Sequence, residues 1–182
     1  DSGDGGGMDE QISLNEEESN NDIETLNFFD FDGTLVDSPE PEEGKELYAK
    51  IMGTVYPHIG WWSKKESLEP FDIKPIQSTI TELENRKNEP NSLTILLTNR
   101  IKELEPTVKA ILEKNNLYFD DYNFKSQNNE KSDRIKEYIK KYPTVKNINV
   151  YDDRDKEIAM FNELKKELEP QGIYVNVFHV KK

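Results

Sequence analysis

Cysteine is absent from the 182 residues of this chain, and no apolar run approaches the length of about 20 residues that crosses a bilayer. Without cysteine there is no disulfide, no thiol catalysis and no cysteine-bound zinc, and a disulfide-stabilised secreted mini-domain is excluded. We therefore expect an intracellular, cytoplasmic protein with no membrane partner. The length suits one domain with its own core.

Lysine and arginine are missing from residues 1–25, which carry nine of the acidic residues. These nine account for most of the formal net charge of −13 and leave −4 for the rest of the chain. The low apolar content predicts a disordered acidic tail over residues 1–24, and the opening DSGDGGG before Met8 is typical of a cloning remnant. A functional segment that mimics nucleic acid is the alternative. The mildly acidic remainder does not exclude a local basic groove for nucleic acid.

Beyond residue 25, short runs rich in branched and aromatic residues alternate with amphipathic stretches, and no internal repeat is visible. This alternation predicts an α/β fold with right-handed crossovers, in which a five-stranded, mostly parallel sheet has helices on both faces. Ligands of such sheets bind at the carboxyl ends of the strands. The predicted strands are residues 26–30, 93–98, 121–124, 147–151 and 173–180.

Two carboxylates, Asp30 and Asp32, lie at the end of the first predicted strand. One carboxylate can act as the nucleophile of phosphoryl transfer and form an aspartyl-phosphate, while the second protonates the leaving oxygen and then activates water. Gly33 and Thr34 permit the sharp turn that the chain needs next. The alternative is a plain turn at a strand end, a role that Asp and Gly often fill.

The run DFDGT at residues 30–34, after an apolar strand, resembles the first motif of the haloacid dehalogenase (HAD) superfamily. The resemblance implies a Rossmann-like HAD core, with Asp30 as the nucleophile and Asp32 as the general acid and base. It also implies a second motif at Thr98, where a hydroxyl and nearby backbone amides hold the phosphate. A helix cap is the other interpretation of Thr98.

The third motif of that family is a lysine that offsets negative charge on the phosphoryl oxygens and on the nucleophile. Lys131 matches its expected place because it begins an amphipathic stretch. Lys125 and Lys136 are alternatives, and each of the three can equally be a solvated surface charge.

The fourth motif corresponds to two acidic residues, Asp152 and Asp153, after the fourth predicted strand. Anions packed this closely would protonate without a cation, so the acidic cluster predicts a bound metal ion. An acidic helix start that complements the helix dipole is the alternative. The resemblance implies Mg²⁺ held by Asp30, the backbone carbonyl of Asp32, and Asp153, with Asp152 and Glu157 as supporting groups.

The chain has little room for a cap over the site. One helix and one strand use up the residues between Thr98 and Lys131, so only residues 38–72 remain for a short cap-like insert and no large cap domain fits. An open cleft of this kind favours a phosphate carried by a large substrate, such as the end of RNA or DNA, or a protein.

The insert contains GWW at residues 60–62, and an arginine closely follows both Thr98 and the acidic pair. In these features the chain resembles the Swiss Army Knife RNA repair-like branch of the HAD superfamily, although Asn99 stands where that branch usually has glycine. The resemblance implies that Thr98, Asn99, Arg100 and Arg154 bind the phosphates of the substrate.

Trp61 and Trp62 have two interpretations, a hydrophobic plug at a junction of the fold or a stacking surface for a base. The predicted function is a magnesium-dependent phosphomonoesterase for a nucleic-acid end, as in RNA repair. The alternatives are a phosphatase for nucleotides or phosphoproteins and, in another class, a noncatalytic HAD-fold binding domain. The sequence leaves the physiological substrate and the oligomeric state open.

Overall fold

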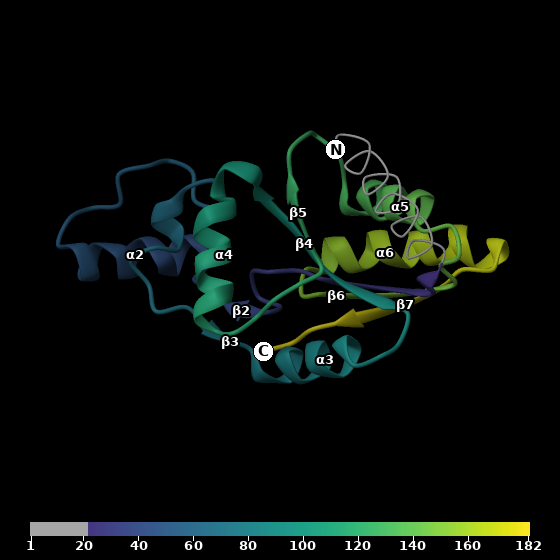
Figure 1. Ribbon diagram of the computed structural model, residues 1–182. Coiled ribbons are helices and arrows are strands. Elements are labelled where there is room, and N and C mark those ends of the chain that lie inside the picture. Colours follow the sequence, from purple (N-terminus) through teal and green to yellow (C-terminus); the bar gives the residue numbers. More distant parts are fainter. Residues whose placement is uncertain (1–21) are drawn as a thin grey trace, which may run out of the picture.

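The computed structural model describes residues 22–182, so nearly all of the predicted tail at residues 1–24 lies outside the described residues. Five parallel strands form the central sheet in the order β5-β4-β1-β6-β7 (Figure 1). This topology confirms the predicted α/β fold with a Rossmann-like core. The strands are β1 (Thr25–Phe29), β4 (Ser92–Ile101), β5 (Asp121–Lys125), β6 (Asn147–Asp152) and β7 (Tyr174–His179).

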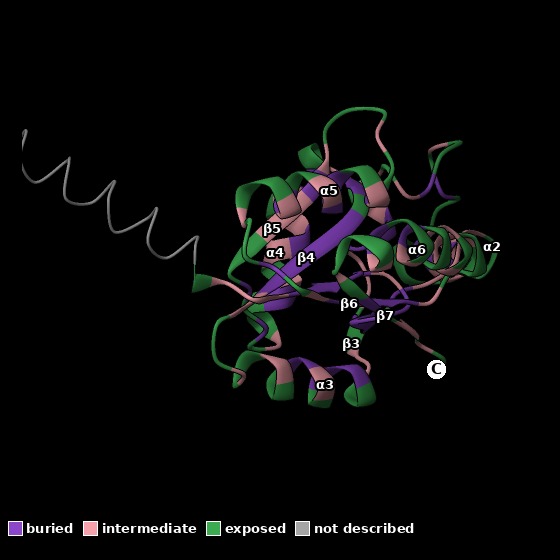
Figure 2. Cartoon of the chain, turned by 90° about the vertical axis from the view of Figure 1, so that its right-hand side faces the viewer, coloured by how far each residue is buried: buried purple, intermediate pink, exposed green. Residues whose placement is uncertain are grey.

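Helices cover both faces of the sheet, because successive residues of each strand point to opposite sides. Phe28 packs with the residues of α5 and α6, whereas Phe29 packs with those of α3 and α4. Figure 2 shows the strands buried between helices whose outer faces are exposed. The helices are α3 (Gln77–Lys87), α4 (Glu105–Lys114), α5 (Lys131–Lys141) and α6 (Asp155–Leu168).

Two rows of side chains cross the middle of the sheet and fix its register. In one row, each asparagine amide donates to the next across β7, β6 and β1. In the other, aromatic rings stack with centroids 4.4 and 4.5 Å apart. A slip of one residue would break both rows and would invert the buried faces, so the carboxyl ends of β1 and β6 are held level. The rows are Asn27, Asn149 and Asn176, and Phe29, Tyr151 and Phe178.

Strand β4 is longer than the predicted strand at residues 93–98. It continues to Ile101, and its pairing with β5 is irregular between Leu97 and Ile101. Such irregularities redirect side chains and are common beside active sites. Here the irregularity covers Thr98, Asn99 and Arg100, which frees them from regular pairing at the edge where the predicted site lies.

The insert at residues 38–72 is tied at both ends by a small antiparallel pair, β2 (Val36–Asp37) with β3 (Lys74–Pro75). It carries helix α2 (Pro41–Met52) and a 3₁₀ turn, Lys65–Ser67, and it holds no inserted sheet. Figure 1 shows α2 projecting to one side of the central sheet. Within the described part of the chain, no helix is long and apolar enough to cross a membrane.

Candidate active site

The centre of the site is a lysine that bridges two aspartates. Lys131 Nζ lies 2.9 Å from Asp30 Oδ1 and 2.7 Å from Asp152 Oδ2. The three side chains come from the first turn of α5, from the residue after β1 and from the end of β6, and all are buried. The crossover topology therefore brings together residues that are up to 122 positions apart in the sequence.

The three lysines considered for the third motif have different surroundings. Lys131 is 2% exposed and contacts Asp30 directly. Lys125 lines a neighbouring hollow, and Lys136 forms a surface ion pair with Glu167 at 2.7 Å. Among these lysines, Lys131 alone is placed where it can act on the predicted nucleophile.

The charges of Asp30 and Lys131 shift each other's pKa. Burial raises the pKa of Asp30 well above its ordinary value, the Asp152 carboxylate raises it further, and Lys131 opposes this shift. Burial alone would lower the pKa of Lys131, but the carboxylates of Asp30 and Asp152 outweigh that effect and raise it. The lysine is therefore held as a cation beside the predicted nucleophile.

The carboxylates of Asp30, Asp152 and Asp153 offer oxygens that all lie within 4.8 Å of one another. Burial, and then the charge of Asp152, also raises the pKa of Asp153. Lys131 contacts Asp30 and Asp152, and Arg154 Nε lies 3.9 Å from Asp153 Oδ2, so the three carboxylates exceed their cationic partners by one negative charge. A divalent cation would offset this excess, so the donor set fits the predicted Mg²⁺.

The oxygens of this cluster are not equally available to a cation. Asp152 Oδ2 contacts Lys131, and its Oδ1 accepts from the backbone amides of Asp153 and Arg154. Asp30 Oδ2 and Asp153 Oδ1, by contrast, both face the hydroxyl of Thr34, at 3.5 and 3.3 Å. Asp30 and Asp153 are therefore better placed as direct ligands, and Asp152 as the partner that orients Lys131.

Arg100 forms a two-pronged ion pair with Asp32. Its Nε lies 2.9 Å from Asp32 Oδ2 and its Nη2 lies 2.8 Å from Oδ1. Its Nη1 donates to the carbonyl of Trp62 and to the hydroxyl of Ser67, and Ser38 donates to Asp32 at 2.6 Å. Four of the five N–H donors of Arg100 are thus used within the protein, and the side chain is placed to orient Asp32. Binding of the substrate phosphate by Arg100 stays a prediction.

Arg134, which the sequence analysis does not identify, binds both Thr98 and Asn99. Arg134 is 2% exposed, donates to the carbonyl of Thr98 and to the side chain of Asn99, and also binds Asn123. It makes no ion pair within residues 22–182, so an unneutralised cation lies beneath the second motif. Its position three residues after Lys131, on the same helix face, is the signal that could have identified it.

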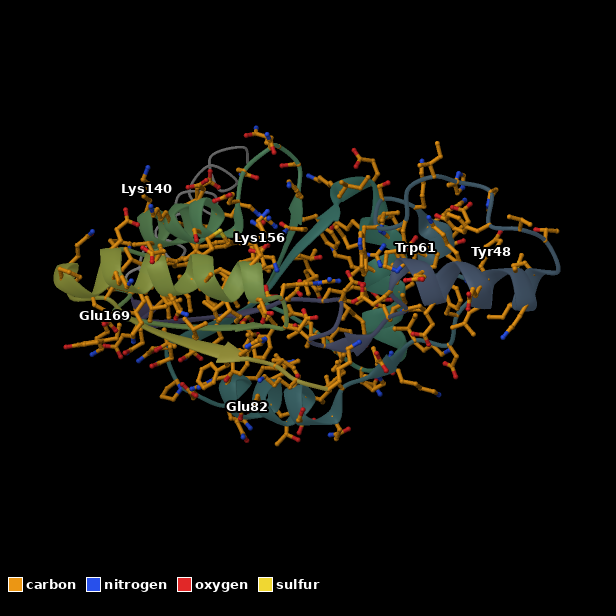
Figure 3. All side chains as sticks on the ribbon, turned by 180° about the vertical axis from the view of Figure 1, so that it is seen from behind. Tyr48, Trp61, Glu82, Lys140, Lys156 and Glu169 are labelled. Atoms are coloured by element: carbon orange, nitrogen blue, oxygen red, sulfur yellow. The ribbon has the colours of Figure 1, made fainter. Side chains whose placement is uncertain are left out.

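The two tryptophans of the insert have different environments. Trp61 is 4% exposed, packs with Tyr48 and Tyr56, and donates its ring N–H to the carbonyl of Pro39 (Figure 3). Trp62 is half-buried and lines the active-site cavity, with the Arg100 guanidinium 5.0 Å from its ring centre. Trp61 is thus the plug, and Trp62 is the aromatic group that faces the site.

A cavity of about 280 Å³ lies above these residues. Arg154 is on its rim, 5.0 Å from the Trp62 ring, and pairs with Glu40 of the insert at 3.1 Å. Asn99 spans the cavity wall, where it donates to Glu157 at 3.1 Å. The cavity is lined by Asp30, Asp32, Trp62, Thr98, Asn99, Arg100, Lys131, Arg154, Lys156 and Glu157.

The sequence model of the family described as HAD domain family 1 in Swiss Army Knife RNA repair proteins matches residues 44–182. The chain belongs to this family. The matched part of the HAD domain includes Thr98, Lys131 and the Asp152–Asp153 pair, whereas Asp30 and Asp32 precede it. Membership confirms the HAD assignment and points to phosphoester hydrolysis as the type of chemistry.

No curated protein matches this chain significantly. Among solved structures, a chain of a Pnkp1/Rnl/Hen1 complex resembles this HAD domain with a TM-score of 0.50 and 14% sequence identity. The alignment covers 87% of this chain and 48% of that one, so this HAD domain spans about half the length of the neighbour. At this identity the likeness concerns the fold alone.

Proposed function

We propose that this HAD domain is a magnesium-dependent phosphomonoesterase that forms an aspartyl-phosphate on Asp30 and acts on a phosphorylated nucleic-acid end. The observation that carries the proposal is the position of Lys131, which bridges Asp30 and Asp152 while Asp153 lies beside the free oxygen of Asp30. A surface turn or a helix start gives no reason to bury a lysine among three carboxylates.

In the first step, an oxygen of Asp30 attacks phosphorus and the bond from phosphorus to the ester oxygen breaks. Lys131 and the hydroxyl of Thr98 stabilise the charge on the phosphoryl oxygens. Thr98 Oγ1 accepts from the amide of Arg100 at 3.0 Å, so its own hydrogen is free to donate to the phosphate. Mg²⁺ held by Asp30, Asp153 and the carbonyl of Asp32 would supply further charge neutralisation.

Asp32 gives a proton to the leaving oxygen and takes one back from the water that attacks the aspartyl-phosphate. That water then forms the new bond to phosphorus, the bond to Asp30 breaks, and inorganic phosphate leaves. Asp32 Oδ1 already accepts from Arg100 and Ser38, whereas Oδ2 accepts from Arg100 alone. A carboxylate oxygen has two acceptor sites, so Oδ2 is the atom that exchanges the proton.

A large substrate is supported by the open side of the cavity. Trp62 of the insert forms part of one wall of the cavity, and Glu40 of the insert pairs with Arg154 on the rim. The insert contains no separate domain that would cover the site. Arg154 is an exposed cation on the rim, with its guanidinium 5.0 Å from the centre of the Trp62 ring. These groups suit a phosphate carried by a nucleotide chain.

The test is a panel of end-phosphorylated RNA and DNA oligonucleotides, free nucleotides, phosphopeptides and a small aryl phosphate, each with Mg²⁺ and with EDTA. We expect oligonucleotides to be the best substrates. Asp30→Asn should lower turnover by about 10³-fold or more, and acid quenching should trap covalent phosphate on the unaltered chain. Asp72→Asn is the matched control, since Asp72 is an exposed carboxylate of the insert.

The panel also separates the alternatives. A preference for free nucleotides or phosphopeptides would replace the proposed substrate but keep the mechanism. Metal-dependent hydrolysis of the aryl phosphate would by itself rule out a noncatalytic binding domain. Equal turnover by Asp30→Asn and Asp72→Asn would contradict the role of Asp30.

A further inference from the structure

We infer that a second polar hollow, beside the catalytic cavity, binds the nucleotide next to the terminal phosphate, with Lys125 and Lys156 contacting the phosphodiester. The inference rests on the proposed function and deepens it, because it makes a polynucleotide the substrate, in preference to a mononucleotide. The hollow lies between the irregular end of β4, the β5–α5 loop and the start of α6.

The two cavities share a wall. Asn99, Lys156 and Glu157 line both the catalytic cavity and the second hollow, whose volume is about 360 Å³. This volume lies in the range of about 300–1,000 Å³ that is usual for ligand sites. A chain with its terminal phosphate at Asp30 and Lys131 can therefore continue past Asn99 without leaving the surface of the protein.

Two lysines on the hollow are free to bind an anion. Lys125 is the last residue of β5, and Lys156 lies in the first turn of α6. Among the described residues, neither lysine makes an ion pair or a side-chain hydrogen bond. Lysines without a partner can bind a phosphate with no existing contact to break. Figure 3 shows Lys156 near the middle of the molecule, where α6 begins, and Lys140 at the far side on α5.

The remaining walls suit the sugar and base of a nucleotide. Asn128 and Asn129 contribute amides, which can both donate to and accept from base edges. Asn129 Oδ1 and Glu157 Oε2 have no hydrogen-bond partner within residues 22–182. A small rotation of Asn129 therefore offers an acceptor without breaking a bond, whereas Glu157 already accepts from Asn99 through Oε1. Met160 supplies the one apolar side chain of the hollow.

The same features argue against a phosphopeptide as the occupant. Peptide recognition relies on strand addition to a sheet edge or on an apolar groove for side chains. This hollow offers no apolar groove, since its lining is mainly charged and amide side chains. The lining holds two lysines and three asparagines beside two carboxylates, Glu130 and Glu157. The lysines and amides match the phosphates and hydrogen-bonding bases of a nucleic-acid strand.

The test uses the full chain with Mg²⁺ and Asp30→Asn, so that binding is measured without turnover. Fluorescence anisotropy follows a labelled tetranucleotide RNA that carries a terminal phosphate, against the matching mononucleotide and a phosphopeptide. We expect Lys125→Gln to weaken tetranucleotide binding roughly five- to tenfold and to reduce the salt slope by about 0.7. Mononucleotide binding should change far less, and Lys125→Arg should restore most of the affinity.

Lys140→Gln is the matched control, since it removes one exposed charge from α5 at a distance from both cavities. It should leave the tetranucleotide affinity unchanged. Equal losses in Lys125→Gln and Lys140→Gln, or a loss that is the same for mononucleotide and tetranucleotide, would overturn the subsite. Stronger binding of the phosphopeptide than of the RNA would overturn it as well. Because the readout is binding, it decides the subsite even if the chain hydrolyses none of these compounds, a result that would refute the proposed function alone.

Discussion

Gly33 lies so close to Asp153 that a Cβ atom at Gly33 would fall inside van der Waals contact with the Asp153 carboxylate. Gly33 also has a φ of +73°, which favours glycine. The glycine of the first motif thus has a second function, because it makes room for a carboxylate that arrives from β6, 120 residues later in the sequence.

This contact predicts a selective effect on metal binding. Gly33→Ala should displace Asp153 and weaken Mg²⁺ binding at least tenfold, as the loss of a supporting contact to a metal site commonly does by about 10–100-fold. Gly53→Ala is the control, since Gly53 has the same φ of +73° but open space around it. Both variants should lose about 1–2 kcal/mol of stability. Calorimetric Mg²⁺ titration that gives the same affinity for both would contradict the contact.

The pairing of Arg100 with Asp32 predicts how a change at Arg100 divides between kcat and KM. Arg100→Lys keeps the charge but loses the fork that orients Asp32, so kcat should fall by about 10²-fold, the lower limit of a general acid–base contribution. KM for the phosphorylated substrate should change little. A rise in KM with kcat preserved would instead show that Arg100 binds the substrate phosphate. Steady-state kinetics with an oligonucleotide and an aryl phosphate provide both numbers.

The raised pKa values of Asp30 and Asp153 predict that the effect of Mg²⁺ grows with pH. In the metal-free protein these carboxyls keep protons at pH values where the unfolded chain has lost them, so stability falls as pH rises from about 3.9 through the raised pKa values. The raised pKa of Lys131 does not alter this slope, because lysine stays charged in both states throughout that range.

Bound Mg²⁺ requires the same carboxylates without their protons. The gain in Tm on adding Mg²⁺ should therefore increase as the pH rises from about 5 to about 7.5. Thermal unfolding across this range is the measurement. A gain in Tm that is independent of pH, or one that survives in Asp153→Asn, would contradict the assignment of the cluster.

The two tryptophans should respond differently to truncation. Trp61→Ala removes a buried ring and its hydrogen bond to Pro39, and should lower the free energy of unfolding by about 3–5 kcal/mol. Trp62→Ala removes a half-buried ring on the cavity wall, so it should affect oligonucleotide turnover more than stability. Urea denaturation and oligonucleotide kinetics on both variants separate the two roles. Reversed results would contradict the division between plug and site.

Much of the fold follows from local patterns. The five predicted strands all occur in the sheet, because their branched and aromatic side chains pack against the layers of helices on its two faces. The end of β4 was predicted three residues too early, at 98 instead of 101. The polar run Thr98-Asn99-Arg100 resembles a loop in sequence, yet the chain stays extended there because the pairing with β5 resumes at Ile101.

By itself, the sequence determined which residues reach the active edge of the sheet: Asp30, Thr98 and Asp153 each follow the apolar part of a parallel strand, and these apolar parts end at the same edge. Only the tertiary structure decided what these residues meet there. It distinguished Lys131 from Lys125, gave Arg100 to Asp32, and left Trp62 at the cavity while burying Trp61. The physical reason is that an ion pair or a ring contact depends on distances of a few ångströms between elements far apart along the chain, which no periodicity of the sequence encodes.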